Sequence, residues 1–474
     1  MFFQALKGPN HRATLGILVA LGVFWCLVMP VRIHAQFPPG SWKYLPDSPD
    51  AGEGSRHRDI FFISESTGWL VDDESQIYRT DDRGETWLKQ FQGENEIEFR
   101  AVAFANEQTG WVGSETKGHV LFETHDGGET WTDITGRIEG AIPFGISAIW
   151  VVNDLVIYAT GSTTGGPWFL ASSTGGATWI GKRIGVQAQT ALDIYFVDNQ
   201  LGLITGGTRE DFFGDAVILR TEDSGDTWHE VIPTFKKTGV DGEWGAQLSF
   251  PNSTAGYLSI EYLNNRKNRY SKVMKTADMG INWAEIEVID NIVPFGLQAI
   301  GFVTENTGWT SGHGISSVTI TGGVFWESLT PYSPLSTGGE LDGSISRIHV
   351  VNETLAYAVG RYVYRYDENE STSVVDLYPG TPREYELSQS FPNPFRQATR
   401  IRFSIQQSAR IVLKVYNSLG VVVRTLVDEP RAPGGFEEMW DGRSANGRRL
   451  TNGLYFFMLR VDGATETMPI VLLR

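Results

Sequence analysis

The sequence is poor in cysteine and in positive charge. Cys26 is the only cysteine, and it lies in an N-terminal segment that we expect to be removed, so disulfides, thiolate metal sites and cysteine nucleophiles are excluded. Lys and Arg number 39 against 56 Asp and Glu, which gives a net charge of −17. A nucleic-acid or anionic-membrane partner needs a basic face, so neither partner is expected. We interpret the acidic surface as a means of keeping the protein dispersed.

The motifs of several common catalytic sites are also missing. The sequence contains no Gly-Lys-Ser/Thr phosphate loop and no nucleophile elbow, and its eight His residues show no metal-ligand spacing. We therefore predict no cofactor and no metal.

The first 35 residues predict a signal peptide. Lys7, His11 and Arg12 form a basic start, residues 15–31 are mostly apolar, and Ala35 is the small residue that signal peptidase requires. Pro30 interrupts the apolar stretch before it reaches about 18 residues, so a retained membrane anchor is the weaker alternative. Cleavage would leave no integral membrane segment, and we expect an exported protein.

Glycine and aromatic residues are abundant. The chain has 53 Gly, 15 Trp and an aromatic content of 12%, a composition typical of turn-rich all-β proteins. A length of 474 residues exceeds what one compact core usually organises, so we expect at least two domains.

One short phrase recurs at regular intervals. It reads Thr80–Trp87, Thr124–Trp131 and Thr221–Trp228, with degraded copies that end at Trp179, Trp283 and Trp326. Successive Trp residues are 44, 48, 49, 55 and 43 positions apart, the period of a four-stranded propeller blade. A strand-turn-strand phrase precedes each copy and occurs seven times. These first halves are 60–71, 102–113, 149–161, 194–206, 248–259, 300–312 and 348–360.

The unequal numbers of first and second halves predict how the ring closes. One outer strand is missing, and residues 41–45 have the character to supply it beside residues 362–366. Closure of this kind removes exposed sheet edges. We predict an all-β chain in which a seven-bladed β-propeller spans residues 36–370, with the N-terminal strand completing the last blade.

The recurring phrase resembles the Asp box, or bacterial neuraminidase repeat. In that turn the Asp carboxylate accepts hydrogen bonds from turn amides, Gly takes the left-handed backbone position and Trp packs between sheets. We therefore expect eight residues to be structural: Asp82, Asp126, Asp223, Asp278, Trp87, Trp131, Trp228 and Trp283. Together with the Gly-Trp turns at 66–69, 108–111 and 306–309, the repeat is similar to the photosystem II stability and assembly factor family. That resemblance implies the architecture and no functional residue.

The composition changes after the propeller. Residues 371–385 are expected to form a linker, and residues 386–474 show short alternating strands typical of a small immunoglobulin-like β-sandwich. Phe391–Phe395, Val415–Gly420, Trp440–Gly442 and Asn452–Phe456 closely resemble the C-terminal sorting domain of type IX secretion substrates, a relative of the sandwich in flagellar hook-capping proteins. The resemblance implies the type IX machinery as a partner and a secreted or surface-attached product. The alternative is an adhesive sandwich that stays attached.

Long loops predict where a ligand would bind. The loops after each Trp-ended strand and the middle loops of the blades share one face, and long loops on a rigid ring are common recognition sites. Six residues on these loops are candidates for ligand contact: Phe144, Phe212, Trp244, Arg266, Arg269 and Phe295. The rings would stack on a surface polymer or a protein partner, and the arginines would hold anionic groups. The alternative for Phe144 and Phe295 is simple packing of blade entries.

The function predicted is that of a noncatalytic binding or assembly scaffold, acting as a monomer. The competing class is an extracellular glycoside hydrolase, which needs two carboxylates at a suitable separation. Asp211, Asp215, Asp241 and Glu243 lie on the loop-rich face, but their spacing does not distinguish them from solvated charges. A sialidase is not expected, because the sequence lacks its opening motif and has seven repeats where six are usual.

Overall fold

The computed structural model of this chain describes residues 41–93, 97–161, 166–185, 188–209, 214–231, 243–262, 271–289, 296–312, 315–324, 326–329, 345–369, 385–417, 420–462 and 464–473. The chain divides into two units, Met1–Gln36 and Phe37–Arg474, and the described residues all belong to the second. The signal-peptide prediction therefore lies outside them. Strands account for nearly all regular structure, with a single 3-10 helix, η1 (Thr135–Arg137), in the described ranges. Nothing helical in these ranges has the length and apolarity to span a bilayer.

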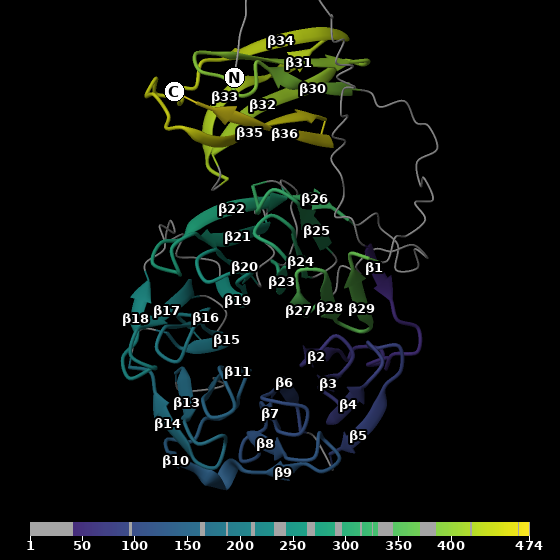
Figure 1. Ribbon diagram of the computed structural model, residues 1–474, viewed down its shortest axis with the longest axis vertical. Helices are drawn as coiled ribbons and strands as arrows, with labels where there is room; N and C mark the ends of the chain where they lie inside the picture. The colour runs from purple at the N-terminus through teal and green to yellow at the C-terminus, as the bar shows by residue number, and fades with distance from the viewer. Residues whose placement is uncertain are drawn as a thin grey trace, which may run out of the picture. The chain divides into compact units, whose positions relative to one another are not determined.

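Seven sheets form within described residues 41–369, and Figure 1 shows them arranged in a ring. We number them as blades in chain order. Blade 1 is β2 (His57–Phe62), β3 (Gly68–Asp72), β4 (Gln76–Thr80) and β5 (Leu88–Gln92); blade 2 is β6 (Phe99–Phe104), β7 (Gly110–Ser114), β8 (Leu121–Thr124) and β9 (Thr132–Asp133). Blade 3 is β11 (Ala148–Val151), β12 (Ile157–Gly161), β13 (Trp168–Ser172), β14 (Trp179–Arg183) and β10 (Ile138–Gly140).

The remaining blades follow the same order from the axis outward. Blade 4 is β15 (Thr190–Phe196), β16 (Gly202–Gly207), β17 (Ala216–Thr221) and β18 (His229–Val231); blade 5 is β19 (Glu243–Ser249), β20 (Gly256–Tyr262), β21 (Ser271–Thr276) and β22 (Ala284–Ile289). Blade 6 is β23 (Ala299–Phe302), β24 (Gly308–Gly312), β25 (Ile315–Thr319) and β26 (Glu327–Ser328); blade 7 is β27 (Arg347–Asn352), β28 (Leu355–Val359), β29 (Val363–Asp367) and β1 (Ser41–Tyr44). Strand β10, which pairs in parallel with β14, was not predicted.

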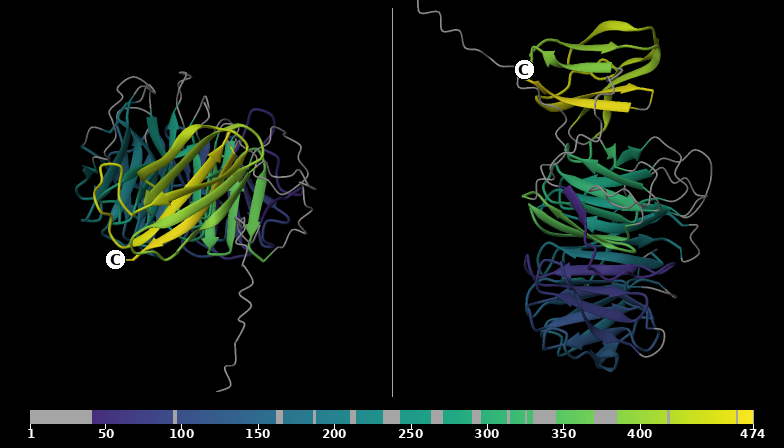
Figure 2. Two further views of the ribbon diagram at one scale, coloured as in Figure 1. Left: turned by 90° about the horizontal axis from the view of Figure 1, so that it is seen from above. Right: turned by 90° about the vertical axis from the view of Figure 1, so that its right-hand side faces the viewer.

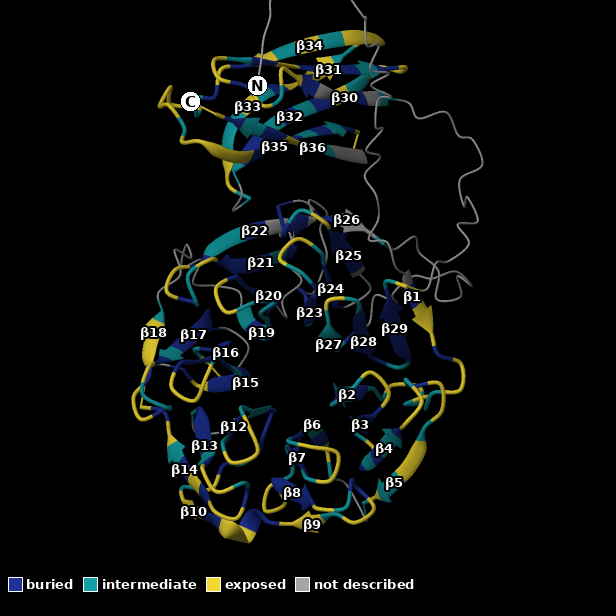
Figure 3. Ribbon diagram, viewed as in Figure 1, coloured by how far each residue is buried: buried dark blue, intermediate teal, exposed yellow. Residues whose placement is uncertain are grey.

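Aromatic rings hold neighbouring blades together. The second strand of a blade presents a ring that stacks on the inner-strand Phe of the next blade. The stacked pairs and their centroid separations are Trp69 and Phe104 (3.5 Å), Tyr158 and Phe196 (4.0 Å), Tyr257 and Phe302 (3.5 Å), and Tyr357 and Phe62 (3.7 Å). Such contacts bury large apolar areas between sheets that share no ladder of hydrogen bonds. Figure 3 shows the resulting pattern, with buried strands and exposed turns.

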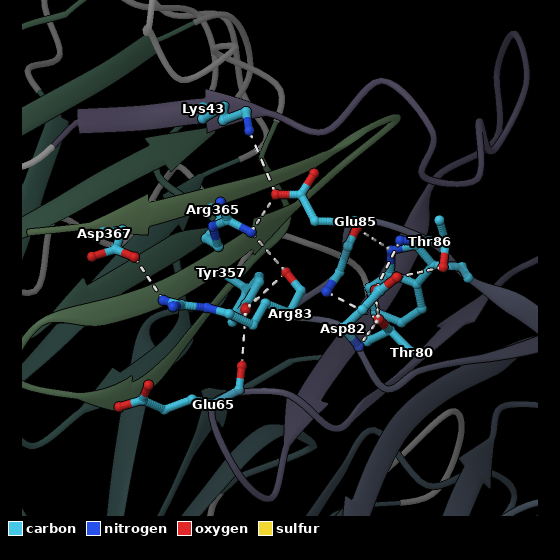
Figure 4. Close-up of polar contacts among 12 residues, drawn as sticks. Lys43, Glu65, Thr80, Asp82, Arg83, Glu85, Thr86, Tyr357, Arg365 and Asp367 are labelled. Atoms are coloured by element: carbon cyan, nitrogen blue, oxygen red, sulfur yellow. Dashed lines mark hydrogen bonds and ion pairs between the residues drawn. The ribbon is translucent and has the colours of Figure 1, made fainter. Parts of the chain in front are cut away.

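The first and last parts of the ring share one sheet. Strand β1 runs antiparallel to β29, with Trp42 opposite Tyr366, and so supplies the outer strand that the seventh repeat lacks. The first blade then meets this sheet through polar contacts drawn in Figure 4. Arg83 pairs with Asp367 at 2.6 Å, and Glu85 lies 2.8 Å from Arg365.

The C-terminal residues form two sheets that lie face to face, as the right-hand view of Figure 2 shows. One sheet contains β30 (Tyr385–Phe391), β31 (Thr399–Ile405) and β34 (Gly434–Trp440). The other contains β33 (Val422–Arg431), β32 (Ala409–Asn417), β35 (Gly453–Val461) and β36 (Ala464–Leu472). Strand β30 begins at Tyr385, so the predicted linker 371–385 ends one residue too late. The rest of that linker, apart from Tyr385, lies outside the described residues.

The Phe-Pro-Asn-Pro-Phe motif holds the last strand of the sandwich. The Asn393 side chain accepts a hydrogen bond from Val471 N at 2.8 Å and donates one to Pro469 O at 3.0 Å. Phe395 is buried, and its ring centroid lies 5.3 Å from that of Trp440. The motif therefore covers part of an edge that β36 would otherwise expose.

Candidate functional site

The four predicted Asp-box carboxylates make the same set of turn contacts. Asp223 is representative: its Oδ1 accepts hydrogen bonds from Thr227 N at 2.8 Å and from Thr221 Oγ1 at 2.7 Å, and its Oδ2 accepts one from Thr227 Oγ1 at 2.6 Å. These bonds favour the charged form, so the hydrogen bond from Thr227 lowers the pKa of Asp223 to about 2. Asp82, Asp126 and Asp278 bond to Thr86, Thr130 and Asn282 in the same way.

The turn also fastens one blade to the next. Two successive residues take the left-handed conformation, Ser224 at φ 62° and Gly225 at φ 82° in blade 4. A Cβ on Gly225 would lie 2.4 Å from the Phe169 ring of blade 3, so glycine is required there. The carbonyl of the first left-handed residue can accept bonds from the preceding blade, and Gly127 O does so from Trp69 Nε1 at 3.0 Å and Arg79 Nη1 at 3.1 Å.

The four Asp-box tryptophans pack edge-on against strand aromatics. Trp228 and Trp283 are buried, whereas Trp87 and Trp131 are half-buried. Their T-shaped partners are Phe169 for Trp228 (5.4 Å), Phe250 for Trp283 (6.3 Å), Phe62 for Trp87 (6.1 Å) and Phe104 for Trp131 (5.9 Å). The eight Asp-box residues therefore stabilise the turns and the packing of the tryptophans against strand aromatics.

The Asp-box turns share a face with the first-half turns, which we call the Asp-box face. In blade 1 the Arg83 amide donates to Ser66 O at 3.0 Å, and the Gly127 amide does the same to Gln108 O at 2.9 Å in blade 2. Blades 3 to 6 repeat this bond.

The six residues predicted to contact a ligand are not brought together by the described structure. Phe144 is half-buried beneath Lys117, whose Nζ lies 4.9 Å from the ring centroid. Trp244 packs against Gly207, where an added Cβ would come within 2.5 Å of the indole. Phe212, Arg266, Arg269 and Phe295 lie outside the described residues.

Sequence reasoning missed a row of polar side chains at the axis. Side chains two positions apart on a strand share a face, so each inner strand offers two residues to the axis. The first row, which we call the charged row, contains Asp59, Ala101, Ala148, Asp193, Gln247, Ala299 and Arg347. Arg347 of blade 7 lies 2.8 Å from Asp193 of blade 4 and 3.3 Å from Asp59 of blade 1. Blades 7 and 4 are not neighbours, so this contact crosses the centre of the ring.

The charged row also satisfies backbone amides of neighbouring blades. Inner strands of adjacent sheets do not pair, so their amides need other acceptors. Asp59 accepts a hydrogen bond from Val102 N at 2.9 Å, and Asp193 accepts one from Leu248 N at 2.8 Å. β-bulges precede both carboxylates in β2 and β15, where they re-aim the strand.

Burial dominates the electrostatics of this row. It raises the pKa of Asp59 to about 6, against the opposing attraction of Arg347. Burial also disfavours the Arg347 cation, but Asp193 and Asp59 outweigh it and raise the pKa of the guanidinium. The three groups therefore form a cluster of one cation and two carboxylates.

A second row lies two residues further along each inner strand, nearer the Asp-box face. This aromatic row contains Phe61, Ala103, Trp150, Tyr195, Ser249, Gly301 and His349. Phe61, Trp150, Tyr195 and His349 are half-buried. Burial lowers the pKa of His349 to about 4, and its Nε2 accepts a hydrogen bond from Phe62 N at 3.1 Å. Aligning the seven first halves on their turns would have shown both rows.

No group of three or more metal-ligating side chains is present in the described ranges.

Comparisons with known proteins agree on a propeller. The family model of the photosynthesis system II assembly factor YCF48 matches residues 53–150, and that of the FlgD Ig-like domain matches residues 393–464. The structure of YCF48 from Cyanidioschyzon merolae has a TM-score of 0.51 at 16% identity and covers 70% of this chain and 100% of that one. These matches support a YCF48-like propeller of bacterial neuraminidase repeats followed by an Ig-like domain.

Carbohydrate-active enzymes are also similar. A xyloglucanase from a Paenibacillus species is 26% identical over 176 residues, which cover 35% of this chain. The chain spans only 16% of the length of that enzyme. The structure of an ancestral GH74 enzyme has a TM-score of 0.50 at 13% identity and covers 90% of this chain and 63% of that one. The relatives thus include an assembly factor and enzymes.

Substitutions at Asp223 test the structural role of the Asp box. Asp223→Ala removes the acceptor for Thr227 N, and we expect a loss of about 1 kcal/mol of local stability. Asp223→Thr should cost less, because Thr174 replaces Asp in blade 3 and its Oγ1 accepts from Thr178 N at 2.9 Å. Hydrogen exchange of the Thr227 amide measures the difference. Equal exchange in both variants would contradict this role.

The sign of the pH dependence follows from the lowered pKa of Asp223. The folded state holds the charged carboxylate more strongly than the unfolded chain, so its contribution is present above the ordinary pKa of 3.8. It is lost as the pH falls through about 2.

Removal of Arg347 tests the axial ion cluster. Arg347→Met leaves Asp59 and Asp193 buried without their cation, and we expect the free energy of unfolding at pH 7 to fall by about 3–5 kcal/mol. Adding Asp59→Asn and Asp193→Asn should restore most of it. Urea unfolding followed by Trp fluorescence provides the measurement. An unchanged free energy of unfolding in Arg347→Met would rule out the cluster's structural role.

The raised pKa of Asp59 determines how the stability of the folded state changes with pH. The folded state binds a proton at Asp59 more readily than the unfolded chain, so this group's contribution to stability grows as pH falls from above 6 towards 4. Arg347→Met should therefore lose less stability at pH 5 than at pH 7.

Proposed function

We propose that this chain is an exported, noncatalytic propeller that acts as a binding or assembly scaffold outside the cell. The charged row supports this proposal, because its carboxylates are occupied by contacts within the protein. Arg347 and backbone amides already engage Asp59 and Asp193, and both carboxylates are buried. A general acid and base must reach the substrate's atoms, and these oxygens are committed to the protein.

A polysaccharide is the ligand that we favour. The similarity to a xyloglucanase and to a GH74 enzyme suggests a surface or environmental glycan, and the similarity to YCF48 suggests a role in assembly. Partly exposed aromatic side chains on a rigid ring suit carbohydrate, because sugar faces stack on them.

An extracellular glycoside hydrolase is the second candidate, and one observation favours it. Asp59 and Asp193 converge on the same guanidinium, and burial raises the pKa of Asp59 to about 6. A buried carboxyl group with a raised pKa is typical of a general acid.

An array of polysaccharides that includes xyloglucan distinguishes the two candidates. The purified full chain should bind without releasing products, as judged by mass spectrometry of the eluate. Products that disappear in Asp59→Asn and Asp193→Asn variants would establish the hydrolase. The absence of both binding and products would contradict a polysaccharide ligand and favour a protein partner.

We also propose that the signal peptide and the C-terminal sandwich direct export through the type IX machinery to the cell surface or the medium. The FlgD-like match and the sorting-domain resemblance support this route. In a host with that machinery, deletion of residues 386–474 should leave the propeller in the periplasm. Surface or medium localisation of the deleted form would refute the role of the sandwich.

A further inference from the structure

The aromatic row gathers rings from several blades near the axis. The Trp150 and Tyr195 centroids are 4.7 Å apart, and Tyr195 stacks on Phe250 at 4.3 Å. Phe61 and His349, from blades 1 and 7, form a second pair at 5.1 Å. Rings in the innermost strands would be expected to be fully covered, yet these are only half-buried. Solvent therefore reaches them.

Two polar atoms in this row are free to bind a ligand. Trp150 Nε1 and Tyr195 Oη show no hydrogen bond to the part of the protein that the structure describes. Burial raises the pKa of Tyr195 to about 12, so its hydroxyl keeps its proton and can donate at neutral pH. By contrast, His349 Nε2 already accepts from Phe62 N.

The charges nearby select against an ionic ligand. Arg347 already pairs with Asp59 and Asp193 two residues away along their strands, so these three charges are engaged within the protein. The propeller residues 41–369 carry 23 Lys and Arg against 45 Asp and Glu, so a polyanion would be repelled. Stacking surfaces with hydrogen-bond donors and no available charge suit a neutral sugar.

We propose that Trp150 and Tyr195 bind a pyranose residue of a neutral polysaccharide, approached from the Asp-box face. The sugar face would stack on the Trp150 indole, and its hydroxyl groups would accept hydrogen bonds from Trp150 Nε1 and Tyr195 Oη. The inference rests on the proposed scaffold function. It differs from the sequence prediction by moving the ligand from the loop-rich face to the axis.

Isothermal titration of the full chain with soluble xyloglucan tests this site. Trp150→Ala should weaken binding about tenfold or more, because it removes both stacking and a donor. Tyr195→Phe removes only the hydroxyl and should weaken binding about threefold to tenfold. Trp244→Ala is the matched control, since Trp244 is the second residue of β19 and lies at the opposite end of the inner strand from the Asp-box face.

Each outcome separates this inference from the proposed function. Binding that survives Trp150→Ala and Tyr195→Phe, or that is lost in Trp244→Ala alone, overturns the axial site and leaves the scaffold standing. Failure of the unaltered chain to bind xyloglucan or any other neutral polysaccharide of the array overturns both the axial site and the polysaccharide ligand. Thermal unfolding verifies each variant, and if Trp150→Ala does not fold, Trp150→Phe and Tyr195→Phe decide the matter.

Discussion

The ring depends on how unpaired backbone groups are satisfied between blades. Each blade completes its own hydrogen bonds, but the inner strands of adjacent sheets lie side by side without pairing, and their amides would be costly to leave bare. Asp59, Asp193 and Gln247 accept hydrogen bonds from amides of neighbouring blades. Asp193 also pairs with Arg347 across the axis. The side chains that fill the centre of the ring thus also accept the hydrogen bonds of backbone amides.

The contact between neighbouring blades at the Asp-box face is stabilised differently. At the Asp-box face the constraint is geometric, because two left-handed residues turn a carbonyl towards the preceding blade. The donors vary with the blade: Trp69 and Arg79 serve Gly127 O, whereas Tyr257 and Lys275 serve Gly322 O. The Asp-box turn therefore keeps the same carbonyl acceptor, whereas the donor residues differ from blade to blade. This explains why the turn is visible in the sequence and its partners are not.

The propeller and the Ig-like sandwich were predictable because their signals are local. The Trp period and the Gly-Trp turns lie within a few residues of one another, so they can be found without three-dimensional information. The axial rows were missed because their members are about 40 to 60 residues apart and change type from blade to blade, as from Asp59 to Ala101 in the charged row and from Ala103 to Trp150 in the aromatic row. The loop residues chosen as ligand contacts stood out by composition alone. Phe144 and Trp244, the two that are described, each pack against a neighbouring segment of the protein.

The pairing of β1 with β29 has a consequence for how the chain reaches its folded state. Trp42 and Tyr366 are partners across 324 positions, so the seventh sheet is the most non-local in the ring. Closing so long a loop is entropically costly, and topologies rich in distant contacts fold slowly. During synthesis the first strand emerges early and must wait, with its pairing edge open, until nearly the whole propeller has followed. A chaperone that shields this short segment would protect the ring at its most vulnerable stage.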